Sequence, residues 1–198
     1  LIFWNILPLY DTAGHALRDA VFQVTSVIST SGFSTTDYNL WPPFAQTILV
    51  LLMFVGGCSG STAGSIKCGR ILLLLRSSTR SLLRLSHPRA VRVVKLDGKV
   101  VDEETLRTVS SFFLCFFALL GVGCLVVSLD GYSLTTSFTA ALGCLSNVGP
   151  GLDLVGPMGN FGLLSGFNKV FLSLLMLIGR LEIFPILLLF LPSTWRRS

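Results

Sequence analysis

Charged residues are scarce in this chain of 198 residues. Asp, Glu, Lys and Arg make up 13% of it, about half of the roughly 25% found in average globular domains. A chain so poor in solvating groups is not expected to be a soluble enzyme or a nucleic-acid-binding domain, despite its net charge of +5. A disordered chain is also excluded, because 52% of the residues are hydrophobic. The remaining class is an all-α polytopic membrane protein.

Groupings of side chains for catalysis or metal binding are also lacking. The chain has two His residues, and its five Cys residues show no C-x-x-C spacing, so no metal site is predicted. The glycine-rich stretch GGCSGSTAGSIK at 56–67 does not match the pattern of a phosphate-binding loop. It is not a nucleophile elbow either, because that motif, G-x-S-x-G, ends in Gly, whereas GCSGS ends in Ser61. We therefore expect no enzyme activity and no cofactor bound by this chain.

Long apolar stretches predict three membrane spans and the tail of another. Residues 109–129 carry no charge and have the length of about twenty residues that a bilayer core requires. The stretch 170–191 is equally long but contains Arg180, and the stretch 44–76 is interrupted by the glycine-rich segment. Residues 1–10 look like the end of a further span, with no initiator Met and no signal-peptide pattern. We expect the chain to be a piece of a longer protein.

Basic residues gather in the linker that follows the interrupted span. Ten of the fifteen Lys and Arg residues lie from Lys67 to Arg107, and two more follow the last span. The positive-inside rule then places the 67–107 linker and the C-terminus in the cytoplasm, with segments 11–43 and 130–169 outside. A nucleic-acid-binding patch is disfavoured because membrane spans flank the linker.

One short segment of the linker has the pattern of a β-hairpin. In VRVVKLDGKVV, residues 91–101, an Asp-Gly pair separates two runs of β-branched residues, which is a two-residue turn signal. We expect a small cytoplasmic hairpin, which is either a docking surface or a solvated connector.

The two halves of the chain repeat the same order of features. LLMFVG at 51–56 matches LLMLIG at 174–179, and STSGFS at 29–34 matches SNVGPG at 146–151. Binding sites of membrane proteins built from repeats lie at the repeat interface, on discontinuous helices. The matched segments are therefore the first candidates for a functional site.

The stretches before the two glycine turns, 16–29 and 133–146, are too short and too polar to cross a bilayer. We expect each to be a re-entrant helix, and its irregular return is tolerated only where it lines a water-filled cavity or is buried in protein. A pore is the simplest explanation. Backbone carbonyls of small residues can replace the hydration shell of a monovalent cation, and Gly permits the positive φ that such a turn needs. The candidate filter residues are Thr30, Ser31, Gly32, Phe33 and Ser34, with Asn147, Val148, Gly149, Pro150 and Gly151.

Five ordered motifs resemble the Trk/Ktr/HKT superfamily of potassium transporters, most of all its bacterial TrkH/TrkG uptake subunits. They are STSGFSTTDY, GGCSGSTAGSIK, HPRAV, SNVGPGL and GRLEIF, and the resemblance covers essentially the whole chain. In that family one chain holds four M1–pore-loop–M2 repeats around a single pore. The resemblance implies potassium uptake across the bacterial inner membrane, filters on the periplasmic side, and filter glycines at Gly32 and Gly149.

The resemblance also implies where the repeats begin and end in this chain. The third repeat takes residues 1–76, with a truncated M1, a pore helix at 16–29, a filter at 30–34 and a broken M2 at 44–76. The basic linker takes 77–106. The fourth repeat takes 107–192, with M1 at 109–129, a pore helix at 133–146, a filter at 147–151 and M2 at 170–191, before the basic tail at 193–198.

The glycine-rich interruption is expected to form a gate. Four Gly residues within 56–67, each costing about 1 kcal/mol against Ala in a helix, argue against a continuous helix. The resemblance implies an intramembrane loop that obstructs the pore below the filter; a glycine-rich packing kink is the alternative. The candidate gate residues are Gly56, Gly57, Cys58, Ser59, Gly60, Ser61, Thr62, Ala63, Gly64, Ser65 and Lys67, together with Arg180.

Arg180 is a charge at predicted membrane depth, where it should face the pore or a partner. The repeat alignment places it opposite Gly57, the first break of the other copy. We hypothesise that it hydrogen-bonds the loop at Ser59, Ser61 or Thr62 and forms a positive barrier. A structural ion pair away from the pore is the alternative.

The resemblance implies several partners besides the lipid bilayer. They are the remaining N-terminal repeats of the same protein, a second copy in a homodimer, and a cytoplasmic TrkA-like regulatory subunit that binds the nucleotide in place of this chain. Nucleic acid is not expected as a partner. Two alternatives stay open for the function: a sodium-permeable protein of the same fold, and a non-conducting membrane scaffold, which the glycines in both filters disfavour.

Overall fold

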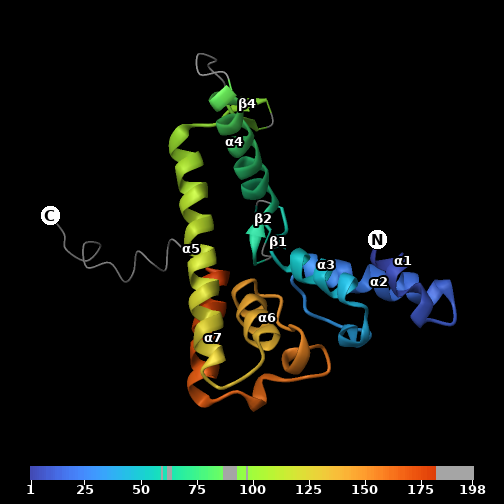
Figure 1. Ribbon diagram of the computed structural model, residues 1–198. Coiled ribbons are helices and arrows are strands. Elements are labelled where there is room, and N and C mark those ends of the chain that lie inside the picture. Colours follow the sequence, from blue (N-terminus) through green and yellow to red (C-terminus); the bar gives the residue numbers. More distant parts are fainter. Residues whose placement is uncertain (59, 62–63, 87–92, 97, 182–198) are drawn as a thin grey trace.

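The computed structural model describes residues 1–58, 60–61, 64–86, 93–96 and 98–181. In these ranges the chain is mostly helical (Figure 1). The α-helices are α1 (Ile2–Ile6), α2 (Ala13–Ile28), α3 (Pro43–Met53), α4 (Cys68–Ser86), α5 (Glu103–Ser128), α6 (Leu134–Leu145) and α7 (Gly166–Arg180). Short 3-10 helices are η1 (Leu7–Leu9), η2 (Tyr38–Leu40), η3 (Asp153–Val155) and η4 (Phe161–Leu163). The strands are β1 (Val55–Gly56), β2 (Ile66–Lys67), β3 (Lys95–Leu96) and β4 (Lys99–Val100).

The longest helix, α5, has one buried face. Its buried residues follow one another at intervals of three or four, as expected for a helix that packs on one side: Leu106, Val109, Phe112, Phe116, Leu120, Gly123 and Val127. The opposite face is apolar but exposed, with Leu114 at 74% and Leu125 at 69% exposure. Within the part of the chain described here, α5 is the one helix long and apolar enough to cross a membrane. Two glutamates in its first turn favour a start at Glu103, before the predicted 109, because negative charge near a helix N-terminus complements the helix dipole.

Helices α5, α6 and α7 pack closely together in the lower half of the molecule (Figure 1). Nine of the twelve residues of α6 are buried. Gly123 of α5 lies where the three helices meet, because a Cβ atom there would come within 2.8 Å of Leu175 Cδ1 and 3.1 Å of Ala141 Cβ. A glycine at this position allows the close approach.

Helix α4 lies beside the first part of α5, away from α6 (Figure 1). The contact is made by an apolar cluster of Leu73, Val94, Leu106 and Val109. The Arg80 guanidinium and the Glu103 carboxylate join the two helices near their common end, at 3.1 Å. The antiparallel pair of β3 and β4 lies at the same end, inside the stretch with the hairpin pattern. Asp97 of that pattern is outside the described residues.

The predicted interrupted span forms two helices with an irregular segment between them. Helix α3 ends at Met53 and α4 begins at Cys68. Strands β1 and β2 pair in parallel between them, with Val55 opposite Ile66 and Gly56 opposite Lys67. The pairing of β1 with β2 therefore closes the irregular segment into a loop, and the two ends of this loop lie side by side. In the other half α7 ends at Arg180, and residues 182–191 of the predicted span, like the 193–198 tail, lie outside the described residues.

Candidate functional site

The two short helices before the glycine turns, α2 and α6, end with the same backbone geometry. After α2, Thr30 has a left-handed φ of 55°, and the Ser31 N–H donates to the Ser26 carbonyl at 3.1 Å. After α6, Asn147 has a φ of 56°, and the N–H of the next residue donates to the Gly143 carbonyl at 3.0 Å. This is the Schellman ending of a helix. It occurs at positions that the repeat alignment pairs, so the halves share local structure as well as sequence.

The predicted filter segments, 30–34 and 147–151, lie against each other. Gly32 has a φ of 72° and Gly149 a φ of 100°, a conformation that residues other than glycine rarely adopt. A Cβ atom on Gly32 would lie 2.2 Å from the Val148 carbonyl oxygen and 3.1 Å from Pro150 Cδ. The two segments thus meet at a glycine, and a side chain there would drive them apart.

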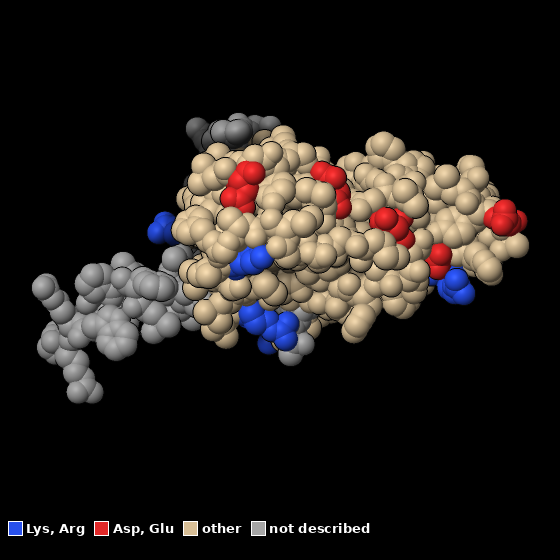
Figure 2. Space-filling model, turned by 90° about the horizontal axis from the view of Figure 1, so that it is seen from below, with Lys and Arg blue, Asp and Glu red and all other residues tan. Residues whose placement is uncertain are grey.

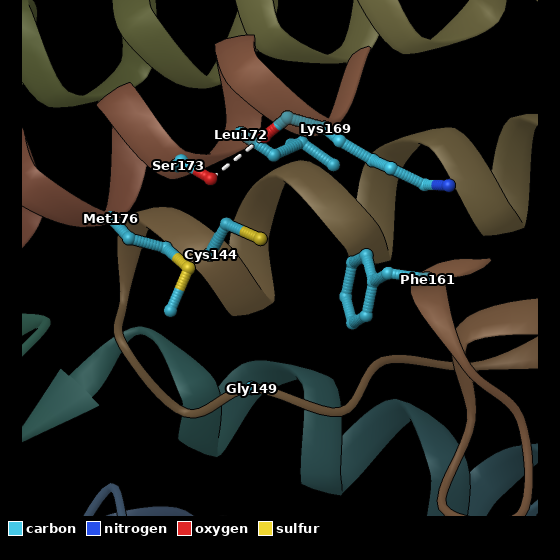
Figure 3. A pocket seen from close by; sticks show the side chains of 7 residues that line it. All are labelled: Cys144, Gly149, Phe161, Lys169, Leu172, Ser173 and Met176. Carbon is cyan, nitrogen blue, oxygen red and sulfur yellow. Dashed lines mark hydrogen bonds between the residues drawn. The ribbon is translucent and has the colours of Figure 1, made fainter. Parts of the chain in front are cut away.

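Gly149 borders open space. A Cβ atom on it would meet no heavy atom within 4 Å, and a pocket of about 270 Å³ lies beside it (Figure 3). The lining is mostly apolar and comes from α6, α7, η4 and the filter segment: Cys144, Gly149, Phe161, Lys169, Leu172, Ser173 and Met176. The ammonium group of Lys169 donates to the Gly162 carbonyl at 2.7 Å. This charge is thus held on the loop that contains η4.

Side chains of α2 hold the chain that leaves the first filter segment. Ser26 Oγ donates to the Phe33 carbonyl at 2.6 Å, and Gln23 Nε2 donates to Ser34 Oγ at 2.8 Å. Thr35 Oγ1 in turn donates to Asp19 Oδ1 at 3.3 Å. Successive residues of the outgoing chain therefore bond to residues progressively nearer the start of α2. Gln23 and Asp19 are both buried. These contacts fix the outgoing chain on one face of the helix.

Helix α6 holds the chain after the second filter segment in the same way. The Leu152 N–H donates to Thr139 Oγ1 at 2.9 Å. The hydroxyls of Ser133 and Thr136 donate to one carboxylate oxygen of Asp153 at 2.6 and 2.7 Å. These hydroxyls hold the pKa of Asp153 below its usual value. The carboxylate comes from the outgoing chain here, whereas after the first segment it comes from the helix.

The glycine-rich loop lies at the beginning of both filter segments, where α2 and α6 end. A Cβ atom on Gly64 would be 2.3 Å from the Ser146 carbonyl oxygen and 2.8 Å from Asn147 Cβ. The Gly64 N–H also donates to Thr30 Oγ1 at 3.3 Å. The loop therefore touches the first residue of each filter segment.

Matching carbonyls in the two halves are bonded by different side chains. Ser65, which has a φ of 65°, donates its buried hydroxyl to the Met53 carbonyl at 2.6 Å. In the other half Asn147 Nδ2 donates to the Met176 carbonyl at 3.1 Å. A Cβ atom on Gly179, which the alignment pairs with Gly56, would lie 1.9 Å from the Leu145 carbonyl oxygen. Helix α7 thus stays helical through Gly179 and packs against the end of α6, whereas α3 ends at Met53.

The remaining predicted gate residues are only partly described. Gly57 and the exposed Cys58 follow β1, Gly60 turns with a φ of 88°, and Lys67 is part of β2. Ser59, Thr62 and Ala63 lie outside the described residues. Arg180 is the last residue of α7 and is exposed in this chain. Its contact with Ser59, Ser61 or Thr62 stays a prediction.

The sequence did not single out the helix residues that hold the filters. Ser133, the N-cap residue of α6, and Thr136 and Thr139 within the helix are spaced by three, a pattern that marks one helix face and could have been noticed. Asp19, Gln23 and Ser26 are spaced by four and three along α2, which is the same signal of one helix face. Among the residues that the structure describes, His, Cys, Asp and Glu form no group of three or more that could hold a metal ion. The polar groups of the filter segments are backbone groups, hydroxyls and the side-chain amide of Asn147.

Comparisons with known proteins agree with one another. The family model described as TrkH, cation transport protein, matches residues 9–197. The Trk system potassium uptake protein TrkH of Salmonella typhimurium is 39% identical over 196 residues, which are 99% of this chain and 40% of that protein. TrkG of Escherichia coli, named in the same way, is 36% identical over 98% of this chain and 39% of its own length.

A solved structure gives the same result. The crystal structure of the potassium transporter TrkH from Vibrio parahaemolyticus superimposes with a TM-score of 0.90 and 38% identity, covering 98% of this chain and 42% of that one. The chain therefore spans about two fifths of the length of the relatives that it matches.

Proposed function

Because the chain belongs to the TrkH family of cation transport proteins, we propose that it forms two of four pore repeats of a potassium uptake protein. The observation that carries this proposal is the pair of filter segments, each with a glycine in left-handed backbone, meeting at Gly32 and Val148. The named relatives are Trk system potassium uptake proteins, and they extend well beyond the part that this chain matches. The remaining N-terminal repeats would complete the pore.

The two filters would select potassium through their backbone carbonyls. Residues 30–34 and 147–151 each follow the C-terminal end of a short helix, where the helix dipole favours a cation. Carbonyl rings of this kind can replace the hydration shell of potassium. The contacts from α2 and α6 support the proposal, because a filter has to hold its carbonyls at fixed positions.

The loop at 56–65 would close the pathway from below. Its contacts through Gly64 with Thr30 and Ser146 support this assignment. Glycines at 56, 57, 60 and 64 leave the loop with few side chains to anchor it, so it could move without disrupting a packed core. Arg180 would add a positive barrier at the same level.

The M1–pore-loop–M2 arrangement would assign α5, α6 and α7 to the fourth repeat, and α2, α3 and α4 to the third. The filters would face the periplasm and the linker the cytoplasm of the bacterial inner membrane. The placement of β3 and β4 at the end of α4 and α5, far from α6, supports this orientation (Figure 1). Figure 2 shows acidic side chains spread over the end that carries the outer loops.

The exposed apolar face of α5 supports contact with lipid or with the missing repeats, because it would be unfavourable in water. A second copy of the protein in a homodimer, and a TrkA-like nucleotide-binding subunit docked on the linker, are the further partners that we propose. The basic residues of the linker, Lys67 to Arg107, would form that docking face.

Ion flux into vesicles that carry the complete protein tests the proposal. We expect rubidium, a potassium substitute, to enter faster than sodium, and vesicles without the protein to take up neither. Equal entry of the two ions would support the sodium-permeable alternative. No entry of either ion would support the non-conducting scaffold and contradict the proposal.

A further inference from the structure

The outer loops that follow the two filter segments are joined by one asparagine. Asn39 of η2 accepts a hydrogen bond at Oδ1 from the Asp153 N–H, at 2.9 Å, and donates from Nδ2 to the Asp153 carbonyl, at 3.1 Å. Its amide thus pairs with both backbone groups of one residue that lies 114 positions away in the chain. Such a two-point contact fixes orientation as well as distance.

Both partners of this contact are held firmly in their own halves. The Asn39 N–H donates to the Asp37 carboxylate at 3.0 Å, and Gln46 of α3 donates to the Asn39 carbonyl at 2.8 Å. On the other side, Asp153 has a left-handed φ of 58°, and its carboxylate accepts from the two hydroxyls at the start of α6. The contact therefore connects α3 rigidly to α6.

A glycine makes room for the asparagine. A Cβ atom on Gly156 would lie 2.1 Å from Asn39 Nδ2, and the three atoms nearest to it all belong to the Asn39 side chain. Gly156 has an ordinary φ of −67°, so its backbone does not itself require glycine. The fit against Asn39 is the reason that the structure offers for a glycine at this position.

We propose that Asn39, seated on Gly156, is a positioning residue that holds the outer ends of the two filters at a fixed spacing and so sharpens their discrimination between potassium and sodium. This inference rests on the proposed function. Asn39 lies five residues after Ser34, and Asp153 lies two residues after Gly151. A change in their spacing is transmitted along short, hydrogen-bonded segments to the filter carbonyls.

Three variants of the complete protein test this inference in vesicles: Asn39→Ala, Gly156→Ala, and the two combined. Asn39→Ala removes both hydrogen bonds, and Gly156→Ala displaces the amide without straining the backbone. We expect each to lower the rubidium-to-sodium flux ratio by about three- to ten-fold, as the loss of one or two net hydrogen bonds would. The double variant should show the same ratio as Asn39→Ala, because the methyl group then has space.

Matched controls separate the contact from general damage to the outer loops. Asn160→Ala removes an exposed asparagine whose side chain accepts only from the nearby Gly162 N–H among the contacts described here, and Gly166→Ala adds a methyl group in open space. Both should keep the wild-type ratio. Asn39→Asp can still accept from the Asp153 N–H but turns a carboxylate oxygen toward the Asp153 carbonyl, so a lowered ratio is expected here too, and this variant carries the test if Asn39→Ala does not fold.

The inference is overturned if Asn39→Ala conducts rubidium with the wild-type rubidium-to-sodium ratio; where that variant does not fold, the same result in Asn39→Asp overturns it. The proposed function would then still stand. Additive losses in the double variant would also overturn the inference, since the two residues would then act separately. A wild-type protein that passes neither ion would instead contradict the proposed function, and with it this inference.

Discussion

The two filter glycines meet different surroundings at the scale of single residues. Gly32 faces the carbonyl of Val148 in the other half, and a methyl group there would lie 2.2 Å from it. Gly149 faces open space beside the pocket. The sequence motif predicts a glycine turn at both positions, because the two segments align. It could not predict this difference, which depends on how the halves are placed against each other.

Arg180 offers the sharpest prediction for a single side chain. Replacing it with Ala should raise rubidium uptake by about ten-fold, the effect of lowering a barrier by roughly 1.4 kcal/mol. The physical reason is that a fixed positive charge on the pathway repels the ion that has to pass. Uptake by vesicles with equal amounts of complete protein measures the change.

Arg107→Ala is the matched control for this experiment. Arg107 is an exposed residue of the first turns of α5, and its removal lowers the net charge by the same amount at a distance from the filter segments. Because Arg107 belongs to the proposed docking face, the vesicles contain no regulatory subunit. We expect its uptake to equal that of the wild type. Unchanged or lower uptake in Arg180→Ala would contradict a barrier role and favour a structural ion pair.

At the scale of helices, the sequence predicts most of the elements that position the site. The predicted pore helix 133–146 and the observed Leu134–Leu145 differ by one residue at each end, because Ser133 caps the helix start and the Schellman ending sets its stop. The predicted helix 16–29 begins earlier, at Ala13. Strands β1 and β2 were not predicted, since a glycine-rich stretch has no periodicity from which pairing could be read.

The crossing of α5, α6 and α7 gives a prediction about packing. Gly123→Leu would push a side chain into Leu175 and Ala141, and overpacking of this kind costs about 1–3 kcal/mol. The variant should therefore lose its folded, monodisperse state at a lower temperature than the wild type. Size-exclusion chromatography of the heated, detergent-solubilised complete protein measures this.

Gly121→Leu is the control for the packing prediction. It lies two residues away on the exposed side of α5, where an added Cβ atom meets nothing within 4 Å. Leucine also favours a helix over glycine, so we expect no loss of stability. If both variants lost the folded state at the same lowered temperature, close packing at Gly123 would be contradicted, because the exposed position would then be as sensitive as the buried one.

At the scale of the whole molecule, family membership was predictable and the joining of the halves was not. Five short motifs indicate the family, and the family model that matches residues 9–197 confirms it. The contact from Asn39 to Asp153 joins residues 114 positions apart, beyond the reach of any local pattern. The carboxylates near the two filters also occupy different elements: Asp19 belongs to the helix before the first filter, whereas Asp153 belongs to the chain that leaves the second filter. An alignment of the repeats gives no signal for such an exchange.

In the proposed function, left-handed glycines in two matched segments hold the carbonyls that select potassium. The most direct test is the rubidium-to-sodium flux ratio of the complete protein with Gly149→Ser. Gly149 has a φ of 100° and no neighbour for a side chain to strike, so the substitution acts through its backbone conformation. Gly166→Ser is the control, since it also enters open space but without left-handed backbone. We predict a ratio at least about ten-fold below wild type for Gly149→Ser, a barrier change of roughly 1.4 kcal/mol, and no change for the control. A wild-type ratio in a Gly149→Ser protein that still conducts would contradict selection of potassium by the filter carbonyls.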